Sequence, residues 1–515
     1  MGYTTTNENG FTDKKAADEI MSAVPDEYES DAVIVGAGAA GLMAAYFLNR
    51  NGRKVIVLEK GVSAAVSNFA RCGGSAACET RLQEEAGAAV TLDRMYRHMY
   101  EYSRGSVNGK LLRNVLACTG TAVNTMLDLG IGMSLMEDTY GVGFRGRHFF
   151  DVSGANRTRP IVDSVEKNRG IFLHKTEGKE IVLSETGSVV GLKALRRTGE
   201  EVFIRTRSVL VCTGGFLGSS KMQMEHFNTK VFALGNTLSD GGGIRMVQAA
   251  GGALDRNFTV AGNECGAVSA ATEGWPFTAA WKNRNEHYGY WLFGGLFVDR
   301  NGERFIDEGR IARYPLAVGG EALVRVGKAY VILDSSYYNA CYTEGIRSHL
   351  GFPKEWISAE AADYYNPSET NQASHLKEAI AEGWACRSNT LDELADYFGL
   401  RHLKETVEKY NQYCTDGADR EFGKDACFLK PVAVPPFYAF EYIPSGWCTL
   451  GGLKTDSRLR ALKADNEPIP GLYAAGNDIG SMYSVPYYDN EGASVGLALG
   501  SGVLAAGEMS DYLNK

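Results

Sequence analysis

The first strong hydrophobic pattern of the chain predicts a strand, a helix and a second strand in quick succession. Residues 31–36 (DAVIVG) form a short apolar run that is typical of a fully buried parallel strand. Residues 42–50 (LMAAYFLNR) are good helix formers, and residues 54–60 (KVIVLEK) form a second buried run after Gly52. This order is that of a βαβ unit.

The remaining pattern predicts a domain inserted into another. Residues 80–135 carry apolar positions at the three- and four-residue spacing of helices, and strand-like runs begin near residue 188. A polar and aromatic region follows, and the last eighty residues return to the glycine-rich, apolar style of the first fifty. We therefore expect an α/β, Rossmann-like domain assembled from both ends of the chain, with a cleft against an inserted α+β domain. The expected boundaries are 1–30 for a polar N-terminal extension, 31–257 and 436–515 for the two parts of the Rossmann-like domain, and 258–435 for the insertion.

Composition excludes several classes of protein. A net charge of −9 gives no basic surface for nucleic acid. No run approaches the roughly 20 apolar residues of a membrane span, and the polar first thirty residues lack the apolar core of a secretory signal. The ten cysteines form no CxxC pair, and the eight histidines no HxxxH motif, so we expect reduced thiols and no bound metal. We expect a soluble, cytoplasmic protein without an integral membrane segment.

A glycine-rich turn lies between the first strand and the helix. Residues 36–41 read GAGAAG, which is the GxGxxG pattern of dinucleotide-binding turns. Gly36 permits the tight turn, Gly38 lets the backbone approach a pyrophosphate, and Gly41 permits close packing of helix on strand. Glu59 ends the second strand, where a carboxylate accepts hydrogen bonds from ribose hydroxyls. A glycine-rich loop without a ligand is the alternative, but motif, context and acidic residue together favour a dinucleotide.

Two later segments favour FAD over a nicotinamide. Residues 209–215 (VLVCTGG) and 471–478 (GLYAAGND) resemble the two glycine-rich turns that follow the first motif in flavoproteins with dinucleotide-binding domains. The resemblance implies a set of FAD-binding residues drawn from all parts of the Rossmann-like domain. They are Gly36, Gly38, Ala39, Ala40, Gly41, Glu59, Lys60, Ser67, Gly73, Gly74, Thr213, Gly214, Asp240, Gly476, Asn477, Ser494 and Val495.

From about residue 31 to residue 507 the chain resembles one flavoprotein family. It contains fumarate reductase, succinate dehydrogenase flavoprotein, urocanate reductase and 3-ketosteroid dehydrogenases. The landmarks are GAGAAG, SNFARCGGSAA, VCTGGF, SDGGGIRM, GGLFVDRNGERFIDE, TLGGL and GLYAAGN. The resemblance implies that 258–435, which contains RFIDE, is a capping domain over the flavin. Covalently flavinylated relatives carry a histidine within the SNFARCGGSAA region; none occurs here, so we expect non-covalent FAD.

The charged residues that hold dicarboxylates in this family are missing. By the resemblance, a proton-donating cap arginine falls at Tyr338, a histidine at Cys448 and a late arginine at Tyr487. A desolvated carboxylate without a partner costs several kcal/mol, so a dicarboxylate should bind poorly. Tyrosine keeps its proton at neutral pH and can hydrogen-bond a carbonyl oxygen. The expected substrate is therefore a bulky enone such as a 3-ketosteroid.

The resemblance to ketosteroid dehydrogenases suggests a mechanism. A hydride would pass between flavin N5 and the β-carbon of the enone, in either direction. Tyr338, or less favourably Tyr337, would exchange the α-proton, and Tyr487 or Tyr488 with the N–H near Gly492 would stabilise the enolate oxygen. Proton-relay positions would fall at Glu308, Arg310 and Arg313.

Other interpretations stay open from sequence. The tyrosine pair 337–338 could be aromatic core, and Glu308 with its neighbouring arginines a solvated surface ion pair. The substrate could be an unsaturated carboxylate of the fumarate, urocanate or cinnamate type, held by Arg145, Arg147, Arg310 or Arg313. A non-catalytic flavoprotein is a third class, disfavoured by the large cap. No second dinucleotide motif is evident, so we expect a separate electron donor or acceptor.

Overall fold

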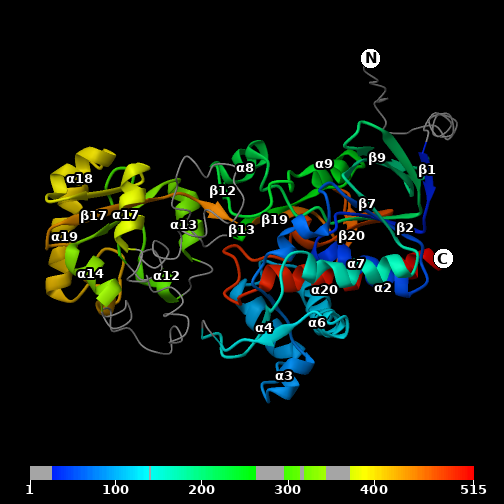
Figure 1. The fold of residues 1–515 in the computed structure, drawn as a ribbon, viewed down its shortest axis with the longest axis horizontal. Coiled ribbons are helices and arrows are strands. Elements are labelled where there is room, and N and C mark those ends of the chain that lie inside the picture. Colours follow the sequence, from blue (N-terminus) through cyan, green and yellow to red (C-terminus); the bar gives the residue numbers. More distant parts are fainter. Residues whose placement is uncertain (1–25, 139–140, 262–294, 314–317, 344–371) are drawn as a thin grey trace.

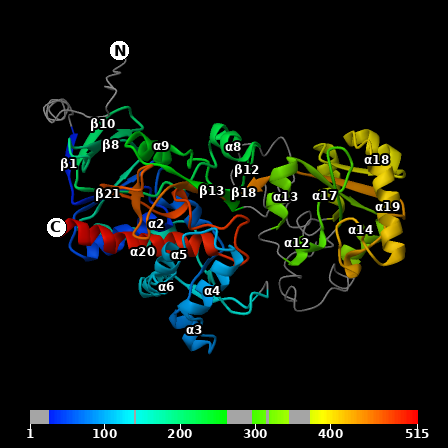
Figure 2. The same ribbon diagram turned by 180° about the vertical axis from the view of Figure 1, so that it is seen from behind.

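The chain folds into two lobes of unequal size (Figures 1 and 2). The computed structural model describes residues 26–138, 141–261, 295–313, 318–343 and 372–515. The larger lobe contains residues from both ends of the described chain, as the sequence predicted. The smaller lobe is the inserted domain.

A six-stranded sheet forms the centre of the larger lobe. Five of its strands are parallel, and β20 joins the edge antiparallel. All strands of the predicted βαβ unit are buried, as apolar runs covered on both faces must be. In sheet order the strands are β20 (Arg460–Leu462), β21 (Pro468–Ala474), β11 (Ser208–Val211), β2 (Ala32–Val35), β3 (Val55–Glu59) and β7 (Ile171–His174).

Two helices from opposite ends of the sequence pack side by side beneath this sheet. They are α2 (Ala39–Arg50) and α20 (Ala493–Leu513). Their backbones can approach closely because Gly502 of α20 has no side chain. A Cβ added there would lie 2.2 Å from the carbonyl oxygen of Ala40. This contact joins the N-terminal and C-terminal parts of the larger lobe.

Two further sheets of more than two strands lie in the larger lobe, besides the two-stranded pairs β12 (Phe232–Ala233) with β18 (Ser445–Gly446) and β13 (Leu254–Ala261) with β19 (Cys448–Leu453). One has the order β1 (Asp26–Glu29), β10 (Glu201–Arg205), β9 (Val189–Arg196), β8 (Thr176–Leu183). The other has the order β4 (Gly74–Ala76), β6 (Arg147–Phe150), β5 (Met133–Leu135). The other helices of this lobe are α3 (Arg81–Glu85), α4 (Leu92–Tyr102), α5 (Gly109–Leu116), α6 (Thr119–Asp128), α7 (Ala155–Lys167), α8 (Ser220–Phe227) and α9 (Gly242–Ala249).

The inserted domain is an antiparallel sheet flanked by helices, and therefore α+β. Its sheet has the order β14 (Leu296–Asp299), β15 (Ala329–Leu333), β17 (Phe437–Tyr442), β16 (Ala385–Ser388). Around it lie α12 (Gly309–Arg313), α13 (Val318–Val326), α14 (Ser335–Thr343), α17 (Gln372–Ala381), α18 (Leu391–Phe398) and α19 (Leu403–Asp416). Two aromatic and aliphatic clusters, one on each face of the sheet, form its core.

Three predicted boundaries need correction. Residues 26–29, assigned to a polar extension, form β1 and pair with β10. Residues 258–261, assigned to the cap, belong to β13 (Leu254–Ala261), which pairs with β19 (Cys448–Leu453) of the larger lobe. Strand β17 lies after the predicted end of the cap at residue 435, yet it pairs with β15 and β16 inside the cap sheet.

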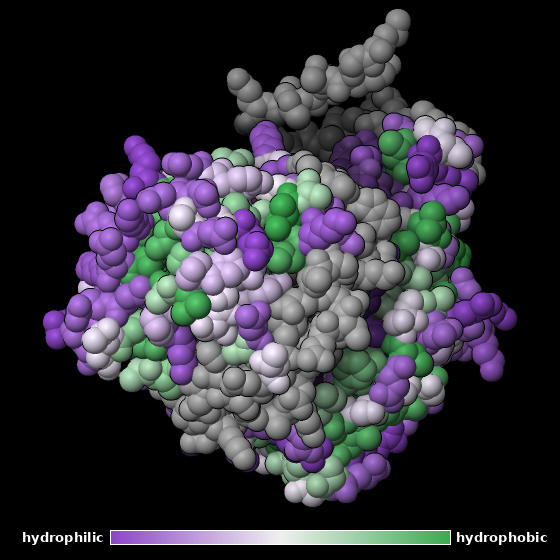
Figure 3. Space-filling view, turned by 60° about the vertical axis from the view of Figure 1, so that its left-hand side comes forward, coloured by the Kyte–Doolittle hydropathy of each residue, from purple (hydrophilic) through white to green (hydrophobic). Residues whose placement is uncertain are grey.

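On the part of the face that Figure 3 colours, hydrophilic side chains lie between small apolar patches. Within the described residues, no helix has the length and hydropathy that a membrane crossing requires.

Candidate active site

A cavity of about 950 Å³ lies at the carboxyl ends of the parallel strands. Ligands of open α/β sheets bind at this edge, and the volume is near the upper end for small-molecule and cofactor sites. The loops after β2, β3 and β11 form its floor. Every lining residue lies between Val35 and Ala261 or between Trp447 and Ala498, so no described residue of the cap lobe contributes to its wall.

The glycine motif has the geometry of a dinucleotide turn. Gly36 has φ +108°, and a Cβ there would lie 2.4 Å from the carbonyl oxygen of Cys212 on the neighbouring strand. A Cβ on Gly41 would lie 1.9 Å from the carbonyl oxygen of Gly36, so this glycine permits the helix to start against the strand. At Gly38 a Cβ would meet nothing within 4 Å, which leaves its backbone open to the cavity. The turn therefore fits a pyrophosphate at the N-terminus of α2.

Acidic and basic side chains lie at the carboxyl end of β3 and next to it. The Glu59 carboxylate, on a residue 8% exposed, accepts hydrogen bonds from the N–H groups of Ala37 (3.0 Å) and Gly61 (2.6 Å). Lys60 Nζ lies 2.8 Å from Asp240 Oδ2. Burial opposes ionisation of Asp240, but hydrogen bonds from Lys60 and the Gly242 N–H hold its pKa below the usual range. All three charged residues line the cavity, at the end that fits the nucleoside part of a dinucleotide.

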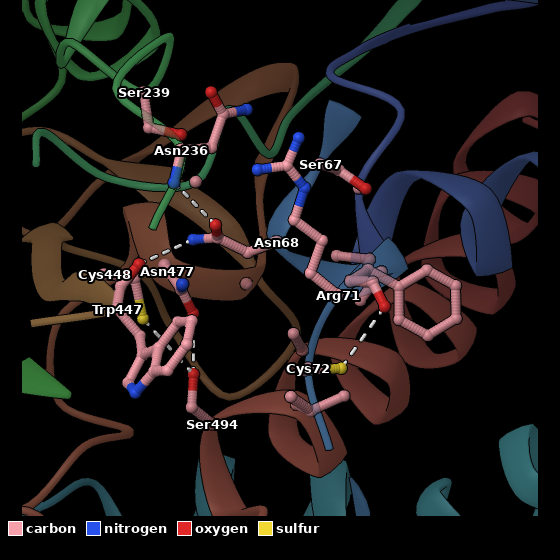
Figure 4. Close-up of a pocket in the computed structure, with 18 of the residues that line it drawn as sticks. Ser67, Asn68, Arg71, Cys72, Asn236, Ser239, Trp447, Cys448, Asn477 and Ser494 are labelled. Carbon is pink, nitrogen blue, oxygen red and sulfur yellow. Dashed lines mark hydrogen bonds between the residues drawn. The ribbon is translucent and has the colours of Figure 1, made fainter. Parts of the chain in front are cut away.

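One side-chain amide and one buried arginine hold the loop from Ser67 to Gly74. Asn68 donates to the carbonyl oxygen of Trp447 and accepts from the N–H of Asn236, each at 2.7 Å, so it links three segments of the wall (Figure 4). Arg157, 2% exposed, donates to the carbonyl oxygens of Val152 (2.9 Å) and Cys72 (2.8 Å). These contacts fix the loop although it has little regular structure.

The N-terminus of α20 forms the opposite wall. Its cap residue Gly492 has φ +81°, and a Cβ there would lie 2.8 Å from the N atom of Ala76. The N–H of Ser494 donates to the Tyr487 hydroxyl at 2.6 Å. The Ser494 hydroxyl lies 3.7 Å from Cys448 Sγ, and the two side chains face each other in Figure 4. The helix dipole makes this end of the cavity suited to a negatively charged group.

A buried carboxylate joins the second and third glycine-rich segments. Asp478 is 0% exposed; its carboxylate accepts from the N–H of Gly215 (2.7 Å), and from the N–H and the hydroxyl (2.9 Å) of Thr213. Burial raises the pKa of Asp478, although these hydrogen bonds act to lower it. The carboxylate therefore holds the turns after β11 and β21 together.

Comparison with known proteins decides the cofactor. A family model described as FAD binding domain matches residues 31–495. The chain belongs to this FAD binding domain family. It is an FAD-dependent oxidoreductase, and the cradle just described fits the cofactor.

Two relatives and two solved structures show which proteins this FAD-binding oxidoreductase resembles. The vinyl phenol reductase of Lactiplantibacillus plantarum is 26% identical over 498 residues, which cover 94% of this chain and 97% of the relative. The urocanate reductase of Eggerthella lenta is 25% identical, with 87% and 70% covered. Among solved structures, the open conformation of a flavocytochrome c3 fumarate reductase superposes with a TM-score of 0.66 at 18% identity (100% and 83% covered). A 3-ketosteroid-Δ4-(5α)-dehydrogenase from Rhodococcus jostii, bound to 4-androstene-3,17-dione, gives 0.62 at 23% (95% and 98% covered). The predicted resemblance to fumarate reductases and ketosteroid dehydrogenases is confirmed.

The predicted FAD-binding residues converge on the cavity. All of them line it except Gly41, whose close contact with Gly36 lies beneath the turn. Of the predicted catalytic residues, Tyr487 and Gly492 line it as well. Tyr488 does not, because its ring is fully buried and its hydroxyl donates to the carbonyl oxygen of Met482 at 2.9 Å. Tyr487 is thus the member of this pair that lines the cavity.

The predicted catalytic tyrosines of the cap lie in its core. Tyr337 and Tyr338 are 4% and 5% exposed, and Tyr338 stacks on Tyr438 with ring centroids 4.1 Å apart. Neither lines the FAD-site cavity. The aromatic-core interpretation therefore describes this arrangement, and direct proton transfer by Tyr337 or Tyr338 has no support in it.

The predicted relay residues are also placed elsewhere. Glu308 is 0% exposed and pairs with Arg304 (2.7 Å) and Lys424 (3.5 Å) inside the cap, so it is neither a cavity residue nor a surface ion pair. Arg310 is an exposed residue whose Nε lies 3.7 Å from Asp307 Oδ2, as the surface interpretation expected. The side chain of Arg313 lies outside the described residues.

Sequence reasoning missed some of the cavity wall. Asn68, Asn236, Arg157 and Glu491 line it and were not singled out. Two of them carried a usable signal: Asn68 lies within the SNFARCGGSAA landmark, and Glu491 directly precedes the helix-capping Gly492. Arg147, considered only as a carboxylate ligand, lies 2.5 Å from Glu491.

Proposed function

We propose that this enzyme transfers a hydride between its flavin and a C–C bond conjugated with a neutral carbonyl, as in a bulky enone such as a 3-ketosteroid. The similarity to a vinyl phenol reductase and a urocanate reductase supports chemistry on an unsaturated C–C bond. The observation that carries the neutral substrate is the uncharged character of the cavity wall around Tyr487 and Cys448.

That wall offers hydrogen-bond donors without net charge. Burial raises the pKa of the Cys448 thiol to about 12. Burial also raises the pKa of the Tyr487 phenol, so both groups keep their protons at neutral pH. The nearby Arg147 guanidinium is matched by the Glu491 carboxylate at 2.5 Å. A dicarboxylate entering here would lose water without gaining two cationic partners, which costs several kcal/mol.

Tyr487 is the residue best placed to polarise a carbonyl. Its oxygen accepts from the Ser494 N–H, so its own proton is available for a second acceptor. Its backbone carbonyl is held in turn by the Tyr102 hydroxyl at 3.1 Å, which fixes the ring against the cavity. Bound FAD would supply the hydride donor or acceptor at its N5. Tyr487 would stabilise the oxygen on which charge develops, as an oxyanion-hole donor does.

A second candidate, reduction of an unsaturated monocarboxylate, keeps one supporting observation. Arg71 is exposed, lines the cavity and points into it from the Ser67–Gly74 loop (Figure 4). One guanidinium can hold one carboxylate in bidentate fashion. This candidate requires a charge on the substrate that the Tyr487 wall does not favour.

A matched pair of ligands separates the two candidates. Benzylideneacetone and cinnamate share a styryl skeleton and differ in carrying a methyl ketone or a carboxylate. The anaerobically reduced holoenzyme is mixed with each, and the return of oxidised-flavin absorbance is followed. Faster reoxidation by the ketone supports the proposal. Faster reoxidation by cinnamate contradicts it and favours the carboxylate candidate.

A further inference from the structure

We propose that Glu491 is a specificity-determining residue that cancels the charge of Arg147 and thereby keeps carboxylate substrates out of the active site. The inference rests on the proposed function in one respect, namely that the preferred substrate is neutral. It adds the residue that enforces the preference.

The two side chains form a close, sheltered pair on the cavity wall. Arg147 Nη1 lies 2.5 Å from Glu491 Oε2, and the side chains are 20% and 19% exposed. Both residues line the cavity. A guanidinium in such a place would attract an anionic substrate, because charges interact strongly where water is partly excluded. Paired with Glu491, it presents no net charge, and the carboxylate repels a second carboxylate.

Three elements of the fold hold the pair in position. Strand register places Arg147 of β6 opposite Ala76 of β4. The N–H of Ala76 donates to the carbonyl oxygen of Gly492 at 3.0 Å, which brings the residue before it, Glu491, next to Arg147. The backbone therefore brings the two side chains together at a partly buried position.

The loop beside the pair leaves room for the Arg147 side chain, which is a second, independent observation. A Cβ at Gly73 would lie 3.2 Å from Arg147 Nη2, and one at Gly74 would lie 3.1 Å from Arg147 Nε. The arginine thus lies across two glycines that leave room for it. Its guanidinium also lies over the Phe149 ring, 5.8 Å from the centroid. Phe149 lines the cavity too, so the pair borders the space available to a substrate.

Other groups face the pair but do not replace Glu491. Tyr487 and Cys72 lie close enough to interact with its charges. Burial is the main cause of the raised pKa of both groups; Glu491 raises the pKa of Tyr487 further, and Arg147 lowers that of Cys72. Both stay protonated at neutral pH and carry no charge. Among the groups described around Arg147, Glu491 is the carboxylate that forms the ion pair with it.

Replacing Glu491→Gln tests the inference by a gain of activity. The amide keeps the shape of the side chain and removes its charge, which leaves Arg147 available to a carboxylate. We expect the ratio of flavin reoxidation rates, cinnamate over benzylideneacetone, to rise at least about tenfold, the effect of one charge-assisted hydrogen bond. The double variant Arg147→Met with Glu491→Gln should abolish that rise, because the freed cation is then gone.

The control is Glu508→Gln, on the same helix α20. Glu508 forms an equally close pair, 2.5 Å from Arg458 Nε, but lies outside the cavity wall. It should leave the ratio at the wild-type value. The flavin content and melting temperature of each variant show whether it is folded. If Glu491→Gln does not fold, Glu491→Asp, which keeps the negative charge, is measured in its place.

The outcomes separate this inference from the proposed function. If wild-type enzyme prefers the ketone and folded Glu491→Gln shows no rise in the ratio, the role of Glu491 is refuted and the proposed function stands. The role of Glu491 is also refuted if Glu491→Asp, which keeps the charge, raises the ratio as much as the roughly tenfold expected for Glu491→Gln. If wild-type enzyme prefers cinnamate, the proposed function fails first.

Discussion

The hydroxyl of Tyr487 gives the sharpest single-atom prediction. Replacing Tyr487→Phe keeps the ring, which is 7% exposed and packs 6.3 Å from the Tyr488 ring centroid, and removes one oxygen. That oxygen accepts from the Ser494 N–H at 2.6 Å and, in our account, donates to the substrate carbonyl. Loss of one donor of this kind lowers the rate about 100- to 1000-fold, or about 3–4 kcal/mol.

The assay is reoxidation of the reduced holoenzyme by benzylideneacetone in a stopped-flow instrument under anaerobic conditions. The matched control is Tyr488→Phe, next in sequence, whose hydroxyl bonds Met482 and does not reach the cavity. It should lose stability, about 1 kcal/mol for one hydrogen bond, with little change in rate. A Tyr487→Phe rate within about threefold of wild type, under 1 kcal/mol of barrier, would refute the carbonyl role. A large loss in Tyr488→Phe would move that role to Tyr488.

Three further predictions concern the cofactor, pH and the cap. Gly41→Val should yield protein with little or no bound flavin by absorbance, because the added Cβ would lie 1.9 Å from the Gly36 carbonyl oxygen. Burial lowers the pKa of His148 to about 4, so folded His148 stays neutral while the unfolded residue gains a proton below pH 6.5. Stability should fall as pH drops from about 6.5 to 4, by up to about 3 kcal/mol from this residue, and His148→Gln should flatten that decline in melting temperature. Arg304→Met should destabilise the cap by about 3–5 kcal/mol, because it strands the buried carboxylates of Glu308 and Asp419. Limited proteolysis should then cut the cap at lower temperature than the FAD domain; equal resistance to wild type would contradict this.

Local signals predicted the FAD domain well. The buried runs at β2 and β3 and the glycines between them leave few alternatives, because short apolar runs and a GxGxxG turn fit one supersecondary unit. The same holds for Glu59, whose place at the end of a strand determines where its carboxylate points. Recognition of the later glycine-rich segments then located the residues on the opposite wall, including Ser494.

The catalytic assignment in the cap could not be read from the sequence in the same way. The pair Tyr337 and Tyr338 follows a buried strand, and an aromatic pair there packs equally well into a core or a substrate site. Glu308 is buried between two cations, and one of them, Lys424, lies more than a hundred residues later in the sequence, where no local pattern indicates it. The Arg147–Glu491 pair is likewise non-local, and it forms only because β4, β6 and α20 meet.

The central claim, hydride transfer to a neutral enone, is tested most directly with substrates of the two charge classes. The purified flavoprotein is reduced anaerobically and mixed in separate experiments with a 4-ene-3-ketosteroid, a 1,4-diene-3-ketosteroid, and fumarate, and products are identified by mass. Our account predicts reoxidation of the flavin by at least one steroid enone, with a product two hydrogens heavier, and none by fumarate. Reoxidation by fumarate, with both steroids inert, would contradict it.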